Sequence, residues 1–285
     1  MVSFQNVFYV YNKKSPLQFT ALRDVNLTIK DGSFTGLVGK TGSGKSTLIQ
    51  HINALFQPTE GVVSVNGYEN RFGLKHKGKE IKELRKNVGL VFQFPENQLF
   101  EETVEKDVAF APKNFGIAEK DALEMAHEAL TRVGLGPEFY SRSPFDLSGG
   151  EKRRVAIAGV LSFHPSILVV DEPTAGLDPS GAEEMMALFK KVHESGTTVI
   201  LVTHDMELVF SYCDQVIVMD RGSVAEICDP ASLFSKDLEQ YSLERPPLYR
   251  LIAKLNEKGA GIDAASIHSL AELAGCISKK KGKAK

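Results

Sequence analysis

The sequence predicts an α/β fold with a mostly parallel sheet, an inserted α-helical subdomain and a small C-terminal helical extension. Three observations support this prediction. Runs rich in β-branched and aromatic residues alternate with segments of helical spacing in residues 1–93 and again in residues 165–226, where we place the core. Helical spacing predominates in residues 94–164, the subdomain. Short amphipathic segments occupy residues 227–285, the extension.

The strands and helices of the core are predicted from their period and their flanking turns. In its first part we expect strands at Val2–Val10, Ala21–Ile29, Ser33–Val38, Val62–Val65 and Val88–Phe92, and helices at Thr47–Phe56 and Lys79–Lys86. In its second part we expect strands at Ile167–Asp171, Thr198–Val202 and Gln215–Asp220, and helices at Ala182–His193 and Met206–Ser211. Because strands alternate with helices, the sheet should be largely parallel and covered on both faces.

Helices should form the subdomain and the extension. In the subdomain we expect them at Val104–Phe115, Lys120–Val133 and Glu151–Phe163. In the extension, Asp229 and Pro230 can open a short helix, and Leu248–Asn256 and Ala264–Leu273 have amphipathic spacing. The lysine run Lys279–Lys285 fits either a solvated tail or a segment that contacts lipid headgroups or a partner.

Composition narrows the function. The chain has 285 residues and a formal net charge of −2, which argues against nucleic acid as an obligatory partner. No apolar run approaches the ~18–20 residues that cross a bilayer, and the N-terminus does not look like a signal peptide. Work at a membrane would therefore need a partner protein. Cys213, Cys228 and Cys276 lack metal-ligand spacing and fit the reduced thiols of a cytosolic protein.

A glycine-rich loop stands between a predicted strand and a predicted helix. Its residues are Gly39, Lys40, Thr41, Gly42, Ser43, Gly44, Lys45 and Ser46, followed by Thr47. They match the pattern G-x-x-x-x-G-K-[ST] in its required context. The glycines let successive N–H groups face the β- and γ-phosphates of a nucleotide, and the helix dipole adds to their effect. Lys45 supplies positive charge, and the Ser46 hydroxyl can bind Mg²⁺.

Two carboxylates end the predicted strand Ile167–Asp171. Asp171 should lie at the carboxyl edge of the sheet near the metal, and Glu172 could polarise a water for in-line attack on the γ-phosphate. Many strands end in acidic residues, so the pair alone is a weak signal. In this order after the phosphate loop, the pair is a strong signal of a P-loop NTPase, a class that hydrolyses nucleoside triphosphates.

The run Leu147–Glu151, which reads LSGGE, narrows the class further. Ser148 and the backbone of Gly149 and Gly150 would form a second anion-binding helix N-terminus, too far from the first loop to serve the same phosphate. On these residues the sequence resembles the ABC ATPase family, whose signature begins LSGG. Two chains set head-to-tail would let each signature close over the other's ATP, which implies an obligatory dimer. Glu151 replaces the commoner glutamine, and we expect this to leave the phosphate-facing residues untouched.

The resemblance implies roles for further residues. It implies that Tyr11 stacks on adenine, with a core or edge-strand aromatic as the alternative because Tyr9 is a near neighbour. Gln93 matches a sensor of γ-phosphate and Mg²⁺ at the joint to the subdomain. His204 matches a histidine that contacts the γ-phosphate and helps position the attacking water, and Ala175–Asp178 matches the loop that contacts the opposite subunit. The residues expected to carry catalysis are Lys45, Glu172 and His204.

The stretch after Gln93 resembles one branch of the family. Residues Phe92–Val104 look like the cobalt-type ATPases of energy-coupling-factor (ECF) importers, as do Lys106–Phe110, Pro112–Asn114 and Arg153–Leu161. Gly89–Glu96 is similar to the second of the two paralogous ATPases of these importers.

This resemblance implies a peripheral ATPase at the cytoplasmic face of the cell membrane. A second ABC ATPase, either a paralogue or the same chain, would pair with it under a transmembrane coupling protein. Membrane substrate-binding subunits for vitamins or transition-metal ions would join through the complex. ATP would close the dimer and move Pro95–Phe100 against the membrane protein, and residues past 226 would help hold the two ATPases together.

Three alternatives share part of this pattern. A soluble ABC ATPase of DNA repair or translation usually carries a long coiled-coil insertion or two fused nucleotide domains, which this sequence lacks. The ATPase of an importer with its own soluble binding protein shares every catalytic motif and differs around Pro95–Phe100. A regulatory nucleotide switch would fit better if Glu172 or His204 were absent.

Overall fold

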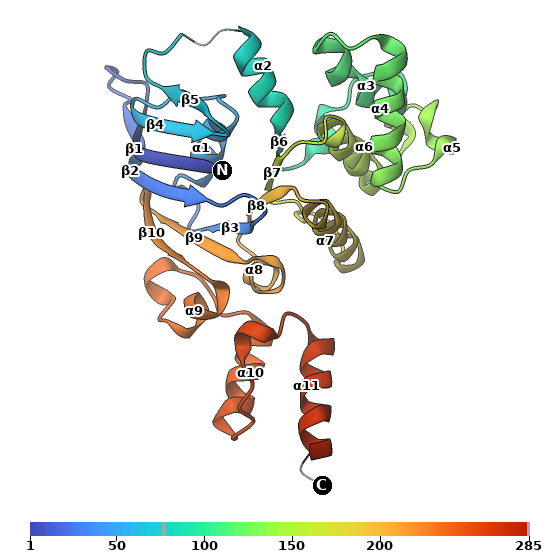
Figure 1. Cartoon of the computed structure of the whole chain (residues 1–285). Helices are drawn as coiled ribbons and strands as arrows, with labels where there is room; N and C mark the ends of the chain where they lie inside the picture. Colours follow the sequence, from blue (N-terminus) through green and yellow to red (C-terminus); the bar gives the residue numbers. More distant parts are fainter. Residues whose placement is uncertain (76–77, 284–285) are drawn as a thin grey trace.

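A computed structural model describes residues 1–75 and 78–283, with side chains described as far as Ser278. Two sheets form the core, a helical lobe lies to one side of them, and a helical extension leads away from the core to the C-terminus (Figure 1). The lobe lies in the sequence between two neighbouring strands of one sheet.

The larger sheet has six strands in the order β10-β9-β3-β8-β7-β6. They are β3 (Phe34–Val38), β6 (Val88–Val91), β7 (Ile167–Asp171), β8 (Thr198–Val202), β9 (Gln215–Asp220) and β10 (Ser223–Cys228). Parallel pairing joins β6 to β7, β7 to β8, and β3 to both β8 and β9, which confirms the prediction of a largely parallel sheet. The edge strand β10 is antiparallel to β9 and was not predicted.

A second sheet of four strands has the order β2-β1-β4-β5, with every pair antiparallel. Its strands are β1 (Val2–Tyr11), β2 (Phe19–Ile29), β4 (Glu60–Val65) and β5 (Tyr68–Arg71). The sequence predicts the first three as strands but does not predict their separation into a sheet of their own. The missed β5 follows a two-residue turn in which Asn66 and Gly67 both have positive φ, the turn that asparagine–glycine pairs favour in hairpins.

One helix fills the space between the sheets. In α1 (Lys45–Ile52), Leu48 and Ile52 are fully buried in a cluster with Val63 of the antiparallel sheet and Ile200 of the parallel sheet. The helix ends at Ile52, four residues earlier than predicted, because Ala54 takes a positive φ of 51° that a helix does not allow. The remaining core helices are α2 (Gly78–Asn87), α7 (Pro179–Glu194) and α8 (Met206–Tyr212).

The helical lobe forms between β6 and β7. It contains the short turns η1 (Pro95–Gln98) and η2 (Pro144–Asp146) and the helices α3 (Val104–Asn114), α4 (Glu119–Arg132), α5 (Pro137–Tyr140) and α6 (Gly149–Leu161). Val108 on α3, Leu130 on α4 and Val155 on α6 are fully buried in the hydrophobic cluster that also contains Val170 of the parallel sheet. The lobe is therefore packed onto the sheet domain through a continuous core.

The extension contains α9 (Pro230–Ser235), η3 (Glu239–Tyr241), α10 (Pro247–Glu257), η4 (Ala264–Ser266) and α11 (Leu270–Lys283). The helix predicted over residues 264–273 is wrong, because an extended segment separates η4 from α11. Ile267 in that segment is buried with backbone in the β region, so its burial in the core interrupts the helix. The predicted alternatives for the lysine run 279–285 concern side chains that lie outside the described residues.

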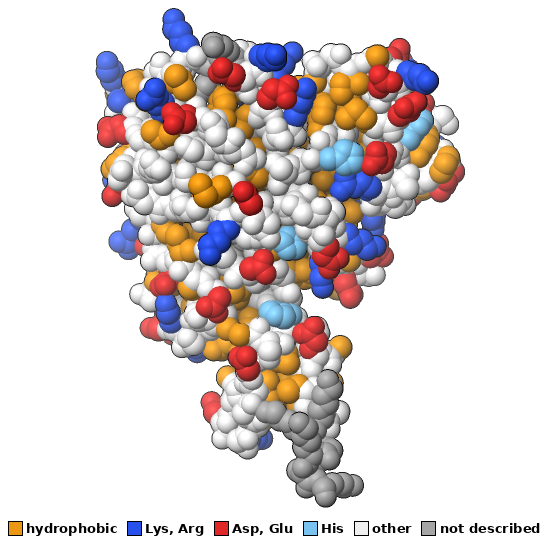
Figure 2. All heavy atoms as spheres, viewed as in Figure 1, with side chains coloured by type: hydrophobic (Ala, Val, Ile, Leu, Met, Phe, Trp, Pro, Cys, Tyr) orange, Lys and Arg blue, Asp and Glu red, His pale blue; other side chains and the backbone are white. Residues whose placement is uncertain are grey.

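Figure 2 shows charged side chains of both signs interspersed over one face, and apolar side chains gathered on the side of the helical lobe that faces α2. Within residues 1–75 and 78–283, no helix has the length and apolar character needed to span a bilayer.

The extension is attached to the core by aromatic packing, which a substitution can test. Phe234 is fully buried, and its ring centre lies 5.8 Å from those of both Phe210 on α8 and Tyr249 on α10. Phe234→Ala should lower the free energy of unfolding by about 3–5 kcal/mol, measured by urea denaturation. Leu251→Ala, on the exposed face of α10, is the control and should cost less than about 0.5 kcal/mol. Equal effects of the two changes would contradict this packing.

Candidate active site

The loop between β3 and α1 has the backbone and the polar groups that an anion requires. Gly39, Gly42 and Gly44 have φ values of 139°, 79° and 102°. At Gly39 a Cβ atom would lie 2.1 Å from the carbonyl oxygen of Met219, so a side chain is excluded there. Ser43 Oγ is buried and has no hydrogen-bond partner among the described residues. Ser43 lines neither cavity at this site, so the loop would present backbone N–H groups rather than this hydroxyl to an anion.

Lys45 begins α1 and turns back over the loop. Its Nζ donates to the carbonyl oxygens of Gly39 at 2.6 Å and Lys40 at 3.0 Å. Burial lowers the pKa of Lys45, while the charges of Glu172 and Asp171 act to raise it. A partly desolvated ammonium in this position can bind phosphate oxygens strongly.

The predicted metal ligands lie together. Asp171 ends β7, and it lines one cavity with Ser46 and Gln93. Burial first, and then the charge of Glu172, raise the pKa of Asp171 to about 6, whereas Lys45 lowers it. A second cation would relieve this repulsion between neighbouring carboxylates. Because hydroxyl, amide and carboxylate oxygens are suitable ligands for Mg²⁺, the donor set fits that ion.

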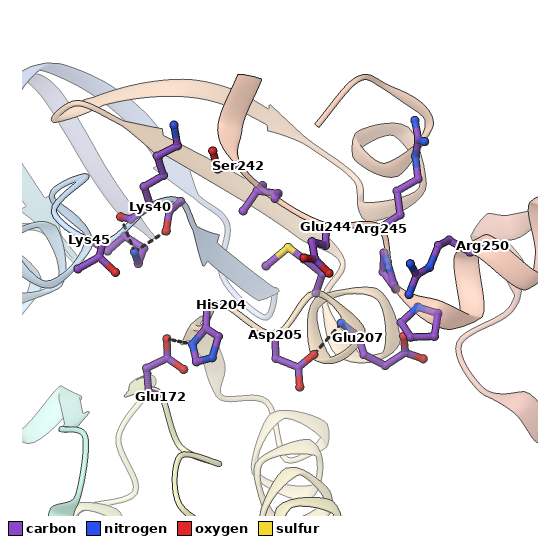
Figure 3. A pocket seen from close by; sticks show the side chains of 16 residues that line it. Lys40, Lys45, Glu172, His204, Asp205, Glu207, Ser242, Glu244, Arg245 and Arg250 are labelled. Carbon is purple, nitrogen blue, oxygen red and sulfur yellow. Dashed lines mark hydrogen bonds and ion pairs between the residues drawn. The ribbon is translucent and has the colours of Figure 1, made fainter. Parts of the chain in front are cut away.

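Glu172 and His204 face each other across the ends of β7 and β8 (Figure 3). Nδ1 of His204 lies 2.8 Å from Oε1 of Glu172, and the Thr203 hydroxyl donates to Oε2 of Glu172 at 3.4 Å. The His204 side chain is 81% exposed, whereas that of Glu172 is 17% exposed. Glu172 also has a positive φ of 47°, a strained value for a residue other than glycine. This pair can hold a water and accept its proton.

Two adjoining cavities surround these side chains. One of about 420 Å³ brings together most of the predicted site residues: Thr41, Gly42, Gly44, Lys45, Ser46, Thr47, Gln93, Asp171, Glu172 and His204. The other, of about 770 Å³, shares Lys45, Glu172 and His204, and its far wall is formed by α8 and residues 242–247 of the extension (Figure 3). The exposed Phe19 also lines the smaller cavity, and its sequence context carries no motif that would have identified it.

Tyr11 ends β1 beside this site. Its hydroxyl lies 3.1 Å from Oγ1 of Thr47, so it contacts the first turn of α1. Tyr9 and Phe56 pack edge-on against its ring, with centroids 4.8 Å and 5.6 Å away. Tyr9 is the more enclosed aromatic, since it also stacks on Phe56 and packs edge-on against His51. Tyr11 therefore contacts the first turn of α1, next to the phosphate loop, whereas Tyr9 contacts the last turn of the same helix at His51.

The signature residues lie elsewhere, at the start of α6. Ser148 caps this helix, and none of Ser148, Gly149 and Gly150 lines either cavity. The expectation that Glu151 leaves Ser148 untouched is wrong. One Glu151 carboxylate oxygen accepts the Ser148 N–H at 2.8 Å and the Ser148 O–H at 2.7 Å, which forms a capping box. These hydrogen bonds lower the pKa of Glu151. The Ser148 N–H and O–H, which the sequence predicts as phosphate donors, are therefore already bound to a carboxylate.

The loop of residues 175–178 lies between β7 and α7. Asp178 caps α7 by accepting the Gly181 N–H at 2.8 Å. Gly176 has a positive φ of 75°, and a Cβ there would lie 3.4 Å from the ring of Phe94. The loop is thus in contact with the segment that follows Gln93.

Sequence comparisons place these features among known proteins. The profile of the ABC transporter family matches residues 22–175. The energy-coupling factor transporter ATP-binding protein EcfA2 of Streptococcus pneumoniae serotype 2 (strain D39 / NCTC 7466) is 50% identical over 260 residues, which are 90% of this chain and 92% of the relative. The EcfA2 protein of Spiroplasma kunkelii is 47% identical over 283 residues, which are 98% of this chain and 92% of the relative.

Two solved structures share the fold. The structure of cbiO1 from Clostridium perfringens, part of the ABC transporter complex cbiONQ, is 35% identical and has a TM-score of 0.73, covering 88% of this chain and 98% of that chain. The ATP-binding cassette MJ0796, in a dimeric post-hydrolysis state bound to ADP and Pi, is 33% identical and has a TM-score of 0.71. That comparison covers 81% of this chain and 99% of the cassette.

Removing the Glu151 charge should make the start of α6 a better anion site. Glu151→Gln should lower the ATP concentration that gives half-maximal hydrolysis by about three- to ten-fold, because a negative charge leaves the helix N-terminus. Glutamine can still accept the Ser148 N–H, so the cap is retained. Steady-state hydrolysis at varied ATP measures the effect.

Glu272→Gln is the matched control, because Glu272 accepts the His268 N–H at 2.7 Å in a similar cap at the start of α11. That change should leave the ATP requirement unaltered. If Glu151→Gln left the ATP concentration for half-maximal hydrolysis unchanged or raised it, the Glu151 carboxylate would not compete with phosphate.

Proposed function

Because the chain belongs to the ABC transporter family and, within it, to the ATP-binding proteins of energy-coupling factor transporters, we propose that its two anion-binding helix N-termini serve different ATP molecules. The chain is an ATP-hydrolysing subunit that powers import by such a transporter. Its phosphate loop would hold one ATP, and its Ser148 would close over an ATP held by a second ATPase subunit.

The separation of Ser148 from the phosphate loop carries this proposal. The start of α6 lies in the helical lobe, apart from β3 and α1, and contributes to neither cavity around Lys45 (Figure 1). Its N–H groups would therefore receive a phosphate held by another chain. The similar cassette MJ0796 is dimeric with ADP and Pi bound, which supports the same arrangement here.

Hydrolysis in this arrangement rests on groups at the ends of β7 and β8. Lys45 and the loop N–H groups would bind the β- and γ-phosphates. Ser46, Gln93 and Asp171 would hold Mg²⁺, which would neutralise developing charge on the phosphates when bound. Glu172 would accept a proton from the attacking water, and His204 would orient Glu172 through their 2.8 Å hydrogen bond while its other nitrogen reaches toward the γ-phosphate.

A groove beside Gln93 is the proposed seat of the membrane partner. It has a volume of about 380 Å³ and an apolar lining that includes Leu90, Phe92, Leu99, Phe115, Val160 and Phe163. Next to it, Phe100 is 55% exposed and packs edge-on against Phe110, which is also exposed. Apolar side chains gather on this side of the lobe (Figure 2). Such a surface suits an apolar helix of a transmembrane coupling protein.

This partner would hold the chain at the cytoplasmic face of the cell membrane. Membrane subunits that bind vitamins or transition-metal ions would join through the coupling protein. The membership of cbiO1 in a cbiONQ complex supports an assembly of this kind.

The extension is proposed to help hold the two ATPases together. Leu251 on α10 and Leu270 on α11 are exposed apolar residues on its surface. Residues 242–247 also reach the cavity that contains His204, so contacts made by the extension would lie close to the chemistry.

Glu172→Gln tests the ATPase mechanism. The variant should still bind ATP but should hydrolyse it at least about a hundred-fold more slowly, because the general base is lost. ATP should therefore trap a closed dimer, which light scattering after size exclusion would detect. Lys45→Ala should instead lose ATP affinity. Unchanged turnover in Glu172→Gln would rule out its role as the base, and normal ATP binding in Lys45→Ala would contradict the phosphate loop.

The groove makes a separate prediction. Phe100→Ala and Gln98→Ala together should reduce co-purification of the membrane subunits by about ten-fold or more, because Gln98 lines the groove, Phe100 is an exposed aromatic residue beside it, and a few such residues carry most of the binding energy of an interface. Leu99 is left intact because it is buried and its loss would destabilise the lobe. Phe145→Ala is the control, since Phe145 is 62% exposed on another part of the lobe. Full recovery of the complex with the double variant would exclude this groove as the seat.

A further inference from the structure

Arg153 is an arginine on α6 with a side chain only 3% exposed. It makes more polar contacts than any motif residue on that helix, although no motif of the site uses it. Its guanidinium donates to two segments that are far apart in the sequence, η1 and the loop after β7. Arg153 therefore connects two parts of the molecule that are distant in the sequence.

On one side Arg153 holds the segment that follows Gln93. Its Nε and Nη2 donate to the two carboxylate oxygens of Glu96 in η1, at 3.0 Å and 2.8 Å. Burial acts to raise the pKa of Glu96, but the hydrogen bonds and the positive charge of Arg153 lower the pKa of this carboxyl below its ordinary value. The guanidinium also lies 5.8 Å from the ring centre of Phe94, which has a positive φ of 55°.

On the other side Arg153 holds the loop that follows the proposed catalytic base. Its Nη1 donates to the carbonyl oxygens of Pro173 at 3.2 Å and Ala175 at 2.9 Å. The Ala175 N–H in turn donates to the carbonyl oxygen of Glu172 at 3.1 Å. Thus one planar group connects two segments that each contain a residue with strained, left-handed backbone, Phe94 and Glu172.

We propose that Arg153 is a positioning residue. It couples the loop that follows Glu172 to η1, which borders the apolar groove proposed as the seat of the membrane partner. When ATP changes the conformation at Glu172, the carbonyl contacts of Arg153 transmit the change to Glu96 and so to residues 94–100. This inference rests on the proposed function, because it assumes that Glu172 acts on ATP and that the groove receives the membrane protein.

A purely stabilising role explains the contacts less well. Burying an ion pair costs desolvation that its attraction only partly offsets, so apolar residues of the same volume would stabilise the lobe about as well. An arginine is instead required by geometry. Its planar guanidinium alone can donate two parallel hydrogen bonds to a carboxylate and further hydrogen bonds to carbonyl oxygens. Lysine keeps the charge but cannot make all four contacts.

Hydrogen exchange in the complete transporter complex tests this role without knowledge of the cargo. The complex carries Glu172→Gln so that ATP persists, and amide exchange is followed by mass spectrometry with and without Mg-ATP. In this background we expect ATP to change exchange in residues 94–101 and 173–178 by about five-fold or more. With Arg153→Lys added, the effect of ATP on amide exchange in residues 94–101 should fall below about two-fold. ATP should still slow amide exchange in the phosphate loop.

Two further variants complete the test. Glu96→Gln removes the carboxylate partner but keeps the carbonyl contacts, and it should also weaken the ATP response of residues 94–101. Glu184→Gln is its matched control, because Glu184 pairs at the surface with the neighbouring Arg154 of α6, and the response should persist. Thermal melting identifies a variant that fails to fold. If Arg153→Lys does not fold, the ATP response of Glu96→Gln decides whether the coupling role holds.

The outcomes separate the two proposals. A full ATP response in Arg153→Lys or Glu96→Gln would overturn the coupling role, as would the absence of any response at residues 94–101 in the parent. Altered exchange that is the same with and without ATP would mark Arg153 as structural only and would also overturn it. Failure of ATP to protect the phosphate loop in the parent would instead contradict the proposed function.

Discussion

The parallel pairing of β3, β8, β7 and β6 is the constraint on which the site depends. Parallel strands end at the same edge of a sheet, so the loops that follow these four strands meet there. They carry the phosphate loop, His204, the pair Asp171 and Glu172, and Gln93, in the spatial order of the strands. Residues separated by up to 165 positions, from Gly39 to His204, therefore line one pair of cavities. Disrupting this pairing would scatter the site even if every side chain remained.

Electrostatics leaves two places in this chain with unbalanced charge. Asp171 and Glu172 are adjacent carboxylates in a partly buried site, and Lys45 only partly balances them. At the start of α6 the opposite problem arises, because backbone donors need an anion and Glu151 supplies one in its place. A nucleotide with its cation, and then a second subunit, would satisfy both ends. Under the proposed function, association and catalysis would draw on the same charges.

Local patterns in the sequence predicted most of the parallel sheet and the residues of the phosphate site. The phosphate loop and the strand-end carboxylates were predicted from short-range context, whereas Gln93 and His204 were predicted from the family resemblance, and the structure brings these residues to one cavity. Pairing between distant segments was not accessible in this way. The antiparallel sheet, the edge strand β10 and the buried Ile267 depend on tertiary contacts. Arg153 and Glu96 are 57 residues apart, and neither has a periodic or motif context that would reveal the other.

The extension forms one wall of the cavity that contains the proposed catalytic residues. Residues 242–247 and Arg250 line the cavity of about 770 Å³ that also contains Lys45, Glu172 and His204. They lie outside the residues matched by the family profile, 22–175. A small molecule that filled this cavity would contact Lys45, Glu172 and His204 on one wall and side chains of the extension on the other. An inhibitor could therefore be built to contact the extension and the phosphate loop at once, and its binding would depend on both parts of the chain.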